Sequence, residues 1–165
     1  MEQLGLFHAK DGDSSSRKAS AWKLFVDGAS RGNPGKSGAG VWLTKDAIDV
    51  VSKGFFLGKA TNNQAEYAAL LLGIFFAIKG MQKGDKLVIY SDSQLIVRQL
   101  IGRYRVKAPH IIPLYQQAVS WLSDINYSVK HVLRDKNTVA DRLANEGIEA
   151  KNPLPRGFVL PVSSP

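Results

Sequence analysis

The stretch that decides the fold is TNNQAEYAALLLGIFFAIKGMQKGDKLVIYSD, residues 61–92. Its first part, residues 61–80, carries Ala, Leu and Glu in its first half and predicts a long helix that ends at Gly80. Its last part, residues 85–92, is a continuous apolar run bounded by charge, which predicts a fully buried strand. Because a strand after a crossover helix favours parallel pairing, this stretch indicates an α/β domain.

The segments on either side extend this pattern. Before the helix lie three short apolar segments separated by glycine or charged turns, which predict three antiparallel strands at residues 21–28, 38–45 and 48–58. After residue 92 we expect helices over about 93–102 and 109–122, a strand over 125–133 and a closing helix over about 138–149. The predicted order is βββαβααβα, a mixed sheet flanked by helices.

The two ends of the chain differ in composition from this middle part. Residues 1–20 include a polar, serine-rich run without periodicity and are expected to form a flexible leader. Residues 151–165 are proline-rich and are expected to form an extended tail, in which Phe158 and its neighbours add an edge strand or pack on the core. One domain is therefore expected, over residues 21–150.

Composition limits the class of protein. The chain has 165 residues, is 44% hydrophobic and contains no cysteine, which excludes disulfides and thiolate metal sites and favours an intracellular protein. Residues 68–78 are apolar but too few to span a bilayer, and no signal peptide is evident, so we expect a cytoplasmic protein without a membrane partner. The net charge of +8 suggests a polyanionic partner, although a solvated basic face would give the same balance.

Four carboxylates share one feature, because each falls where a predicted strand or helix begins or ends. Asp27 and Asp92 end strands, whereas Glu66 and Asp141 lie in the first turns of helices. Each also has a local explanation: Asp27 in a turn with Gly28, Asp92 bonded to its own backbone, Glu66 in a capping box with Asn63, and Asp141 in one with Thr138.

Together, the four carboxylates point to a metal site. In an open α/β sheet, strand ends beside helix starts meet at one edge, which would bring Asp27 and Asp92 together. Clustered carboxylates repel one another unless a cation compensates their charge. Oxygen ligands without cysteine favour Mg²⁺ or Mn²⁺, and two such ions support phosphodiester chemistry.

Four motifs resemble those of the ribonuclease H family, type 1. They are DGASRGNPGKSGAG, TNNQAEYAAL, YSDSQL and HVLRDKNTVADRLAN, in that order, and the resemblance covers roughly residues 22–149. It implies the five-stranded ribonuclease H-like fold and hydrolysis of the RNA strand of an RNA/DNA hybrid, leaving 5′-phosphate and 3′-hydroxyl ends. A free-standing, monomeric enzyme that resembles archaeal members is expected.

The resemblance also assigns roles to residues. By position, Asp27 would bridge two Mg²⁺ ions, Glu66 and Asp92 would hold the ion on the leaving-group side, and Asp141 would help to hold the ion that activates water. The residues expected to line the minor groove of the hybrid are Gly28, Asn33, Asn62, Asn63 and Gln94. Amides suit this task because they donate to and accept from 2′-hydroxyls without reading sequence.

Two departures from the family pattern matter. The loop before Asp141 lacks the histidine of well-known bacterial members, so Arg134 is the candidate for its role, through electrostatics only, while His131 is expected to be structural. The basic protrusion of many members is also missing. Basic residues between the third and fourth acids would replace part of it, with Tyr104 either offering its ring to DNA or packing in the core; these are Arg98, Arg103, Arg105 and Lys107.

Other functions remain open from sequence. A non-catalytic nucleic-acid-binding module on the same fold is one alternative, although all four acids are present. A junction resolvase or integrase core does not explain the asparagine pair together with the Gly-Asn-Pro-Gly loop. A domain cut from a reverse transcriptase is the third alternative.

Overall fold

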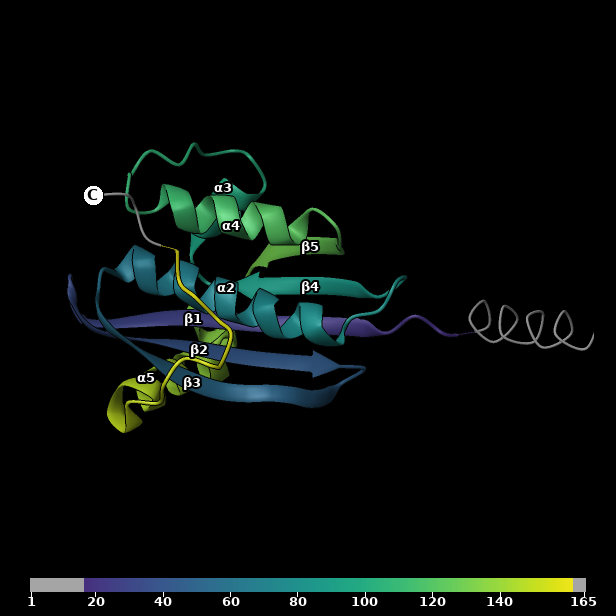
Figure 1. Ribbon diagram of the computed structural model, residues 1–165, viewed down its shortest axis with the longest axis horizontal. Coiled ribbons are helices and arrows are strands. Elements are labelled where there is room, and N and C mark those ends of the chain that lie inside the picture. The colour runs from purple at the N-terminus through teal and green to yellow at the C-terminus, as the bar shows by residue number, and fades with distance from the viewer. Residues whose placement is uncertain (1–16, 162–165) are drawn as a thin grey trace, which may run out of the picture.

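A five-stranded mixed sheet forms the centre of the computed structural model, which describes residues 17–161 (Figure 1). The spatial order of the strands is β3-β2-β1-β4-β5. Strands β1 (Ala21–Gly32), β2 (Gly35–Lys45) and β3 (Ile48–Ala60) pair antiparallel. Strand β4 (Lys86–Ser91) pairs in parallel with β1 and with β5 (Asn126–His131). The predicted βββαβααβα order and the parallel pairing after the crossover helix are confirmed.

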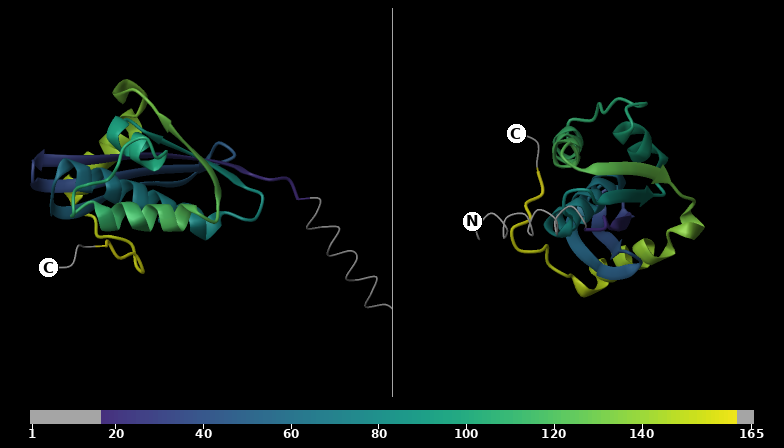
Figure 2. Two further views of the ribbon diagram at one scale, coloured as in Figure 1. Left: turned by 90° about the horizontal axis from the view of Figure 1, so that it is seen from above. Right: turned by 90° about the vertical axis from the view of Figure 1, so that its right-hand side faces the viewer.

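Helices cover both faces of the sheet (Figures 1 and 2). Helices α2 (Asn62–Gly80) and α4 (Ile112–Leu122) lie together over one face, and α5 (Thr138–Ala150) lies on the other, over β1, β2 and β3. The short helix α3 (Gln94–Leu100) follows β4, and a 3₁₀ turn, η1 (Arg134–Lys136), precedes α5. No helix within residues 17–161 is both long and apolar enough to cross a membrane.

Alternation along β1 builds the core between the sheet and α2. Trp22, Leu24 and Val26 are buried, and they contribute to one hydrophobic cluster with the apolar residues of α2. On the opposite face, α5 approaches the sheet closely at Gly40 and Gly54, where a Cβ atom would collide with the α5 backbone. Glycines in β2 and β3 therefore position α5, and with it Asp141.

Strand β1 is longer than predicted. The Asp27–Gly28 pair forms no hairpin turn, because β1 continues to Gly32 in register with β2. The chain reverses instead at Asn33 and Pro34, between Gly32 and Gly35. Asp27 thus lies within a strand and not at its end.

Helix α2 begins with a different cap from the one predicted. Thr61 is the N-cap, and its hydroxyl accepts from the backbone N–H of Gln64, whose side chain accepts in turn from the N–H of Thr61. The predicted capping box of Asn63 and Glu66 is therefore wrong, and Glu66 lies beyond the first turn. Its carboxylate is left free for other partners.

The C-terminal tail packs on the core. After α5 it crosses α2, where the ring of Phe158 is buried against Phe75 and Trp121, with ring centroids 5.3 and 6.4 Å away (Figure 1). Asn152 holds the beginning of the tail to β3, since its carbonyl accepts from the N–H of Phe56 at 2.7 Å. Of the two predicted outcomes for this segment, packing on the core is the one observed for Phe158.

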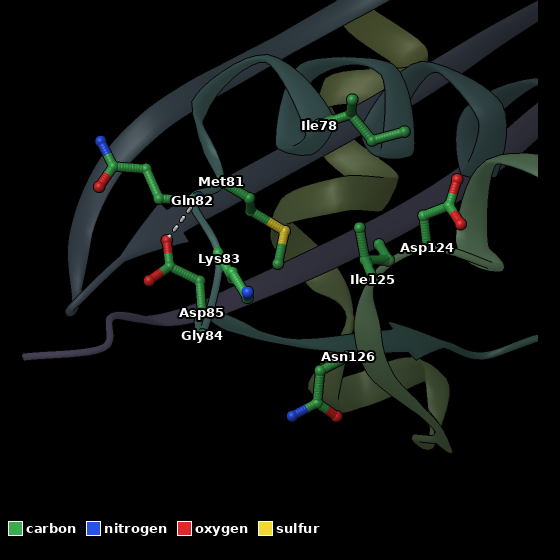
Figure 3. Close-up of a pocket in the computed structure, with 9 residues that line it drawn as sticks. All are labelled: Ile78, Met81, Gln82, Lys83, Gly84, Asp85, Asp124, Ile125 and Asn126. Carbon is green, nitrogen blue, oxygen red and sulfur yellow. Dashed lines mark hydrogen bonds between the residues drawn. The ribbon is translucent and has the colours of Figure 1, made fainter. Parts of the chain in front are cut away.

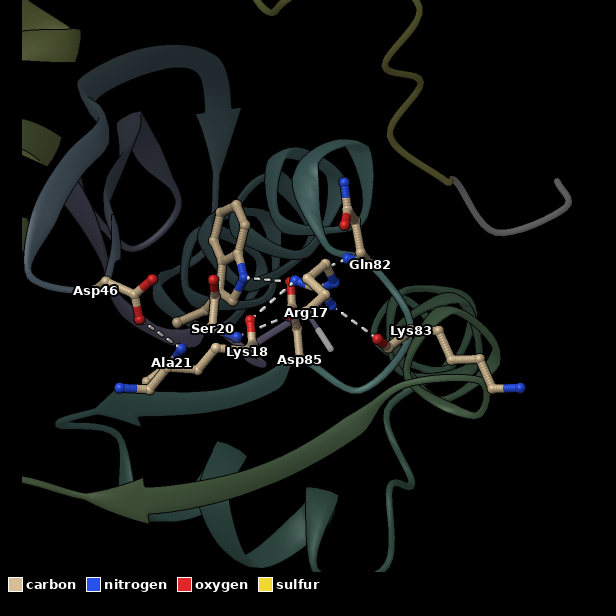
Figure 4. A network of polar contacts seen from close by, with 9 residues as sticks. Arg17, Lys18, Ser20, Ala21, Asp46, Gln82, Lys83 and Asp85 are labelled. Atoms are coloured by element: carbon tan, nitrogen blue, oxygen red, sulfur yellow. Dashed lines mark hydrogen bonds and ion pairs between the residues drawn. The ribbon is translucent and has the colours of Figure 1, made fainter. Parts of the chain in front are cut away.

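A buried carboxylate holds the beginning of the described chain (Figure 4). Asp85 accepts hydrogen bonds from the backbone N–H groups of Ser20 and Gln82, from the indole of Trp22 and from the guanidinium of Arg17, at 2.9–3.0 Å. Most of the predicted leader, residues 1–16, lies outside the described residues. Asp85 lies just before β4, so this contact marks the pole of the sheet where β1 and β4 begin.

Candidate active site

Asp27 lies where the parallel part of the sheet ends. The pairing of β1 with β4 stops at Val26 and Ser91, and beyond this point β1 pairs only with β2. The next residue on β1 is therefore Asp27, which is only 7% exposed, and the residue that directly follows β4 is Asp92. As predicted from the strand ends, the two acids lie close together.

Glu66 reaches the same place from α2. Its carboxylate accepts a hydrogen bond from the backbone N–H of Gly28. The side of Gly28 that a Cβ atom would occupy is filled by the α2 backbone at Ala65 and Glu66. Gly28 therefore lets the helix come close enough for this bond, which is a packing reason for glycine that the sequence motif did not reveal.

Three of the four predicted carboxylates form one cluster. Asp27, Glu66 and Asp92 each offer an oxygen within 4.8 Å of the others, a spacing suited to a shared cation. Asp141 lies outside this group of three, in the first turn of α5. It is exposed, and its side chain is close enough to Asp27 to raise the pKa of that residue. The predicted capping box with Thr138 is absent, since no side chain caps α5.

The electrostatics of the cluster favour a bound cation. Burial raises the pKa of Asp27 far above its ordinary value, and the neighbouring Glu66 and Asp92 raise it further. Burial likewise raises the pKa of Glu66, an effect that Gly28 and Arg134 partly oppose. These carboxylates therefore do not all ionise at neutral pH on their own, whereas a divalent cation would compensate their charge.

The loop between β5 and α5 places three further residues beside the cluster. Arg134 is exposed, in η1, and near enough to Glu66 to lower its pKa. His131, at the end of β5, is also exposed, and its Nε2 lies 3.2 Å from the backbone carbonyl of Asp92. Asn137, which sequence reasoning missed, is 1% exposed and contacts Asp92 at 3.4 Å. Its only sequence signal was a position before a helix, which indicates a cap.

The predicted substrate-binding amides lie in the turn between β1 and β2 and at the starts of α2 and α3. Asn33 lies in the turn between β1 and β2, and its Oδ1 accepts from the N–H of Asn62 at 3.0 Å. Asn62 and Asn63 are exposed at the start of α2, and Gln94 is exposed at the start of α3. Their contacts with a substrate stay a prediction, as do those of Gly28.

The segment between α3 and α4 is a basic loop, residues 101–110, most of which is exposed (Figure 1). Tyr104 is 47% exposed, so its predicted place in the core is excluded. The guanidinium of Arg98 lies over the Tyr104 ring, 5.1 Å from its centroid, and donates to its hydroxyl at 2.6 Å. Arg103, Arg105 and Lys107 are exposed beside it, and together these cations offer a surface for phosphates.

A hollow lies at the pole of the sheet opposite to the carboxylate cluster (Figure 3). Its lining consists of Ile78, Met81, Gln82, Lys83, Gly84, Asp85, Asp124, Ile125 and Asn126. Asp85 already accepts four hydrogen bonds there, so its oxygens are committed to the fold. The metal-binding geometry found within residues 17–161 is therefore that of the cluster around Asp27.

Several known proteins are similar in sequence to this chain. A family model described as reverse transcriptase-like matches residues 25–147. A bifunctional protein of Mycobacterium tuberculosis is 41% identical over 132 residues, which are 77% of this chain and 35% of that protein. Ribonuclease HI of Halobacterium salinarum is 38% identical over 128 residues, 76% of this chain and 63% of that enzyme. The chain thus spans less than two thirds of the length of these relatives.

Solved structures share the fold. The crystal structure of ribonuclease H1 from Halobacterium salinarum superposes with a TM-score of 0.73 at 36% identity, covering 79% of this chain and 98% of that one. LC11 ribonuclease H1, solved in complex with an RNA/DNA hybrid, superposes with a TM-score of 0.71 at 31% identity, covering 79% and 97%.

Proposed function

The chain belongs to the type 1 ribonuclease H family, and on that premise we propose that it is an endoribonuclease that hydrolyses the RNA strand of RNA/DNA hybrids. The observation that carries the proposal is the meeting of Asp27, Glu66 and Asp92 within 4.8 Å at the end of the parallel strands. A module that only binds nucleic acid has no use for three carboxylates placed where they repel both one another and the phosphate backbone.

The donor set suits Mg²⁺, with Mn²⁺ as a substitute. Asp27, Glu66, Asp92 and Asp141 would hold two ions through hard carboxylate oxygens, and no cysteine competes for softer metals. When bound, two such ions activate the attacking water and stabilise the leaving 3′-oxygen, giving 5′-phosphate and 3′-hydroxyl ends.

The chain's own residues position the site for this chemistry. The N–H of Gly28 fixes the carboxylate of Glu66, and the burial of Asp27 keeps bulk water from competing for its oxygens. Arg134, exposed beside Glu66, would place a permanent positive charge near the developing phosphorane charge. It supplies no proton, because a guanidinium does not deprotonate at ordinary pH.

Recognition of the hybrid would be divided between amides and cations. Asn33, Asn62, Asn63 and Gln94 would bond 2′-hydroxyls and base edges of the RNA strand in the minor groove. The basic loop would hold the phosphates of the DNA strand, with the exposed ring of Tyr104 as an apolar surface for sugar or base. Specificity for hybrids would then come from 2′-hydroxyls on one strand and their absence on the other.

The setting of the enzyme is proposed from sequence. The absence of cysteine fits a reducing cytoplasm. A monomer is proposed because all of the carboxylates needed for two ions come from one chain.

The test is cleavage of an end-labelled RNA/DNA hybrid in Mg²⁺, Mn²⁺ or EDTA, beside matched duplex DNA and duplex RNA. We expect metal-dependent cutting of the RNA strand of the hybrid, abolished in Asp92→Asn and retained in Asp124→Asn. Asp124 is an exposed aspartate at the opposite pole, so it controls for loss of one charge. Tight hybrid binding without cutting in any metal would instead mean a non-catalytic binding module.

A further inference from the structure

Asn137 occupies the N-cap position of α5 but does not cap it. Asparagine is among the best N-cap residues, because its side-chain oxygen accepts from N–H groups of the first turn. Here no side chain makes that bond. The Asn137 side chain turns toward the sheet instead, and its Nδ2 donates to the carbonyl of Val26 at 2.9 Å and lies 3.4 Å from Oδ2 of Asp92.

The orientation of this amide follows from its partners. A backbone carbonyl only accepts hydrogen bonds, and so does an ionised carboxylate, so both must face the NH₂ group. Val26 is the last residue of β1 that pairs with β4, directly before Asp27. One amide group therefore joins the end of the parallel ladder, the Asp92 carboxylate and the start of the helix that carries Asp141.

This arrangement has a cost to the fold. Oδ1 of Asn137 is buried and has no hydrogen-bond partner among the described residues. An unsatisfied buried acceptor destabilises the folded protein, and the missing cap destabilises it further. A residue that served stability alone would cap α5, and departures from local rules of this kind concentrate at functional sites.

We propose that Asn137 is a positioning residue, whose side-chain amide holds the Asp92 carboxylate in the direction that metal binding requires. The inference rests on the proposed function, since it concerns the same carboxylates. Without the amide, Asp92 loses its only side-chain partner within hydrogen-bonding range in residues 17–161 and can rotate away from Asp27 and Glu66. Loss of an outer-shell partner of this kind typically lowers metal affinity or activity by about 10–100-fold.

The informative variant is Asn137→Ser. Serine is an equally good N-cap, so it can restore the missing cap of α5, but it is too short to bridge Val26 and Asp92. Asn137→Ala removes both functions and serves as the second variant. The matched control is Asn152→Ala, because Asn152 follows α5 and its Nδ2 donates to the carbonyl of Gly54 on β3 at 3.0 Å, an equivalent bond to the sheet that involves none of the carboxylates.

The experiment measures Mn²⁺ binding by calorimetry, thermal unfolding in EDTA, and kcat and KM for the hybrid. We expect about 10–100-fold weaker Mn²⁺ binding in Asn137→Ser and Asn137→Ala, with a lower kcat and little change in KM. Asn152→Ala should lower thermal stability but leave Mn²⁺ binding unchanged. Asn137→Ser should unfold at or above the temperature of the parent protein.

Failure of this inference and failure of the proposed function look different. If the parent protein binds Mn²⁺ and cuts the hybrid, but Asn137→Ser binds Mn²⁺ as tightly as the parent, the positioning role is overturned and the enzyme stands. If the parent neither binds Mn²⁺ nor cuts the hybrid, the proposed function fails and the inference fails with it.

Discussion

The backbone N–H of Gly28 donates to the carboxylate of Glu66, and so the strand that carries Asp27 is joined directly to helix α2. The bond is possible because Gly28 has no side chain where the α2 backbone passes. Two of the carboxylates proposed to bind metal are thereby held relative to each other through a main-chain N–H group.

The first prediction concerns this contact. In Gly28→Ala, the added methyl group collides with the backbone of Ala65 and Glu66, so α2 must shift and the bond to Glu66 must lengthen. We expect a loss of about 1–3 kcal/mol in the free energy of unfolding and at least about a 10-fold fall in hybrid cleavage. The control is Gly157→Ala, a tail glycine with open space and a φ of +85°, which costs stability without touching the site. Equal activity in both variants would contradict the prediction.

The second prediction concerns pH and metal. The pKa of Asp27 is raised above its ordinary value of 3.8, so the folded protein without metal binds more protons than the unfolded chain above that pH. In EDTA, the contribution of Asp27 to the free energy of unfolding should therefore be most favourable below about pH 4. It should become less favourable as the pH rises toward the elevated pKa of this group. Added Mg²⁺ should restore stability at neutral and alkaline pH.

Urea unfolding at several pH values, with EDTA or Mg²⁺, checks this expectation. Asp27→Asn should remove the larger part of the pH-dependent loss and be more stable than the parent protein in EDTA at pH 8, while being inactive. A parent protein whose stability in EDTA rises steadily from pH 5 to pH 8 would show that the carboxylates do not repel one another as described.

The third prediction concerns the opposite pole. Burial disfavours the charged form of Asp85, but hydrogen bonds from Gln82, Ser20, Arg17 and Trp22 outweigh it and lower the pKa of this carboxyl. Asp85 thus contributes to the free energy of unfolding at pH values above the ordinary pKa of an aspartate. This contribution is lost as the pH falls from that value toward the lowered pKa of the folded protein. Asp85→Asn should cost about 2–4 kcal/mol at pH 7, because an amide cannot accept four hydrogen bonds, and much less at pH 2.

Chemical denaturation at the two pH values tests the Asp85 effect. Hybrid cleavage per folded molecule should be unchanged, since the residue lies at the far end of β4 from Asp92. A variant that keeps its stability but loses activity would place Asp85 in the site.

The fourth prediction concerns the basic loop. Replacing Arg103, Arg105 and Lys107 by alanine should raise KM for the hybrid at least about 10-fold with little change in kcat. It should also reduce the slope of log KM against log salt by roughly one for each phosphate that the loop no longer neutralises. An alanine at Lys83, an exposed cation at the opposite pole, should leave both quantities unchanged. Unchanged salt dependence in the triple variant would exclude the loop from DNA binding.

The fifth prediction concerns Arg134. Loss of its charge in Arg134→Ala should lower kcat by about 10-fold, equivalent to about 1.4 kcal/mol of transition-state stabilisation, with KM nearly constant. Arg134→Lys should recover part of the rate, because the role requires a cation and not a general base. Steady-state kinetics at two metal concentrations test this, and an increase in KM alone would make Arg134 a binding residue instead.

Much of this architecture was predictable from the sequence, because the hydrophobic pattern is local. The long helix over residues 62–80 and the apolar run that follows it carry their periodicity within a few residues, so type and order were predicted correctly. The carboxylates were identified because each falls near a predicted change of element, although Asp27 lies within β1 and Glu66 lies beyond the first turn of α2. Boundaries were less predictable: α4 begins at Ile112 and not near Pro109, because Ala108 accepts from Ile111 and Ile112 in a preceding turn.

What the sequence could not reveal are contacts between distant segments. Asn137 looks like a helix cap, and only its bond to Val26, 111 positions away, shows another role. The Asp27–Gly28 pair is a strong hairpin signal, but pairing along the whole of β1 and β2 outweighs it. In each case tertiary structure overrides a sound local preference.

The hydrogen bonds from Arg17 and Ser20 to Asp85 also fix the place where the chain enters β1. Arg17 and Ser20 are anchored at the pole where β1 and β4 begin, while Asp27 and Asp92 lie where the pairing of these strands ends, about 20 Å away along six paired residues. A partner domain or an affinity tag joined directly to Arg17 would therefore begin at the pole away from the proposed active site. Immobilisation at that pole should leave the proposed active site accessible to long hybrids.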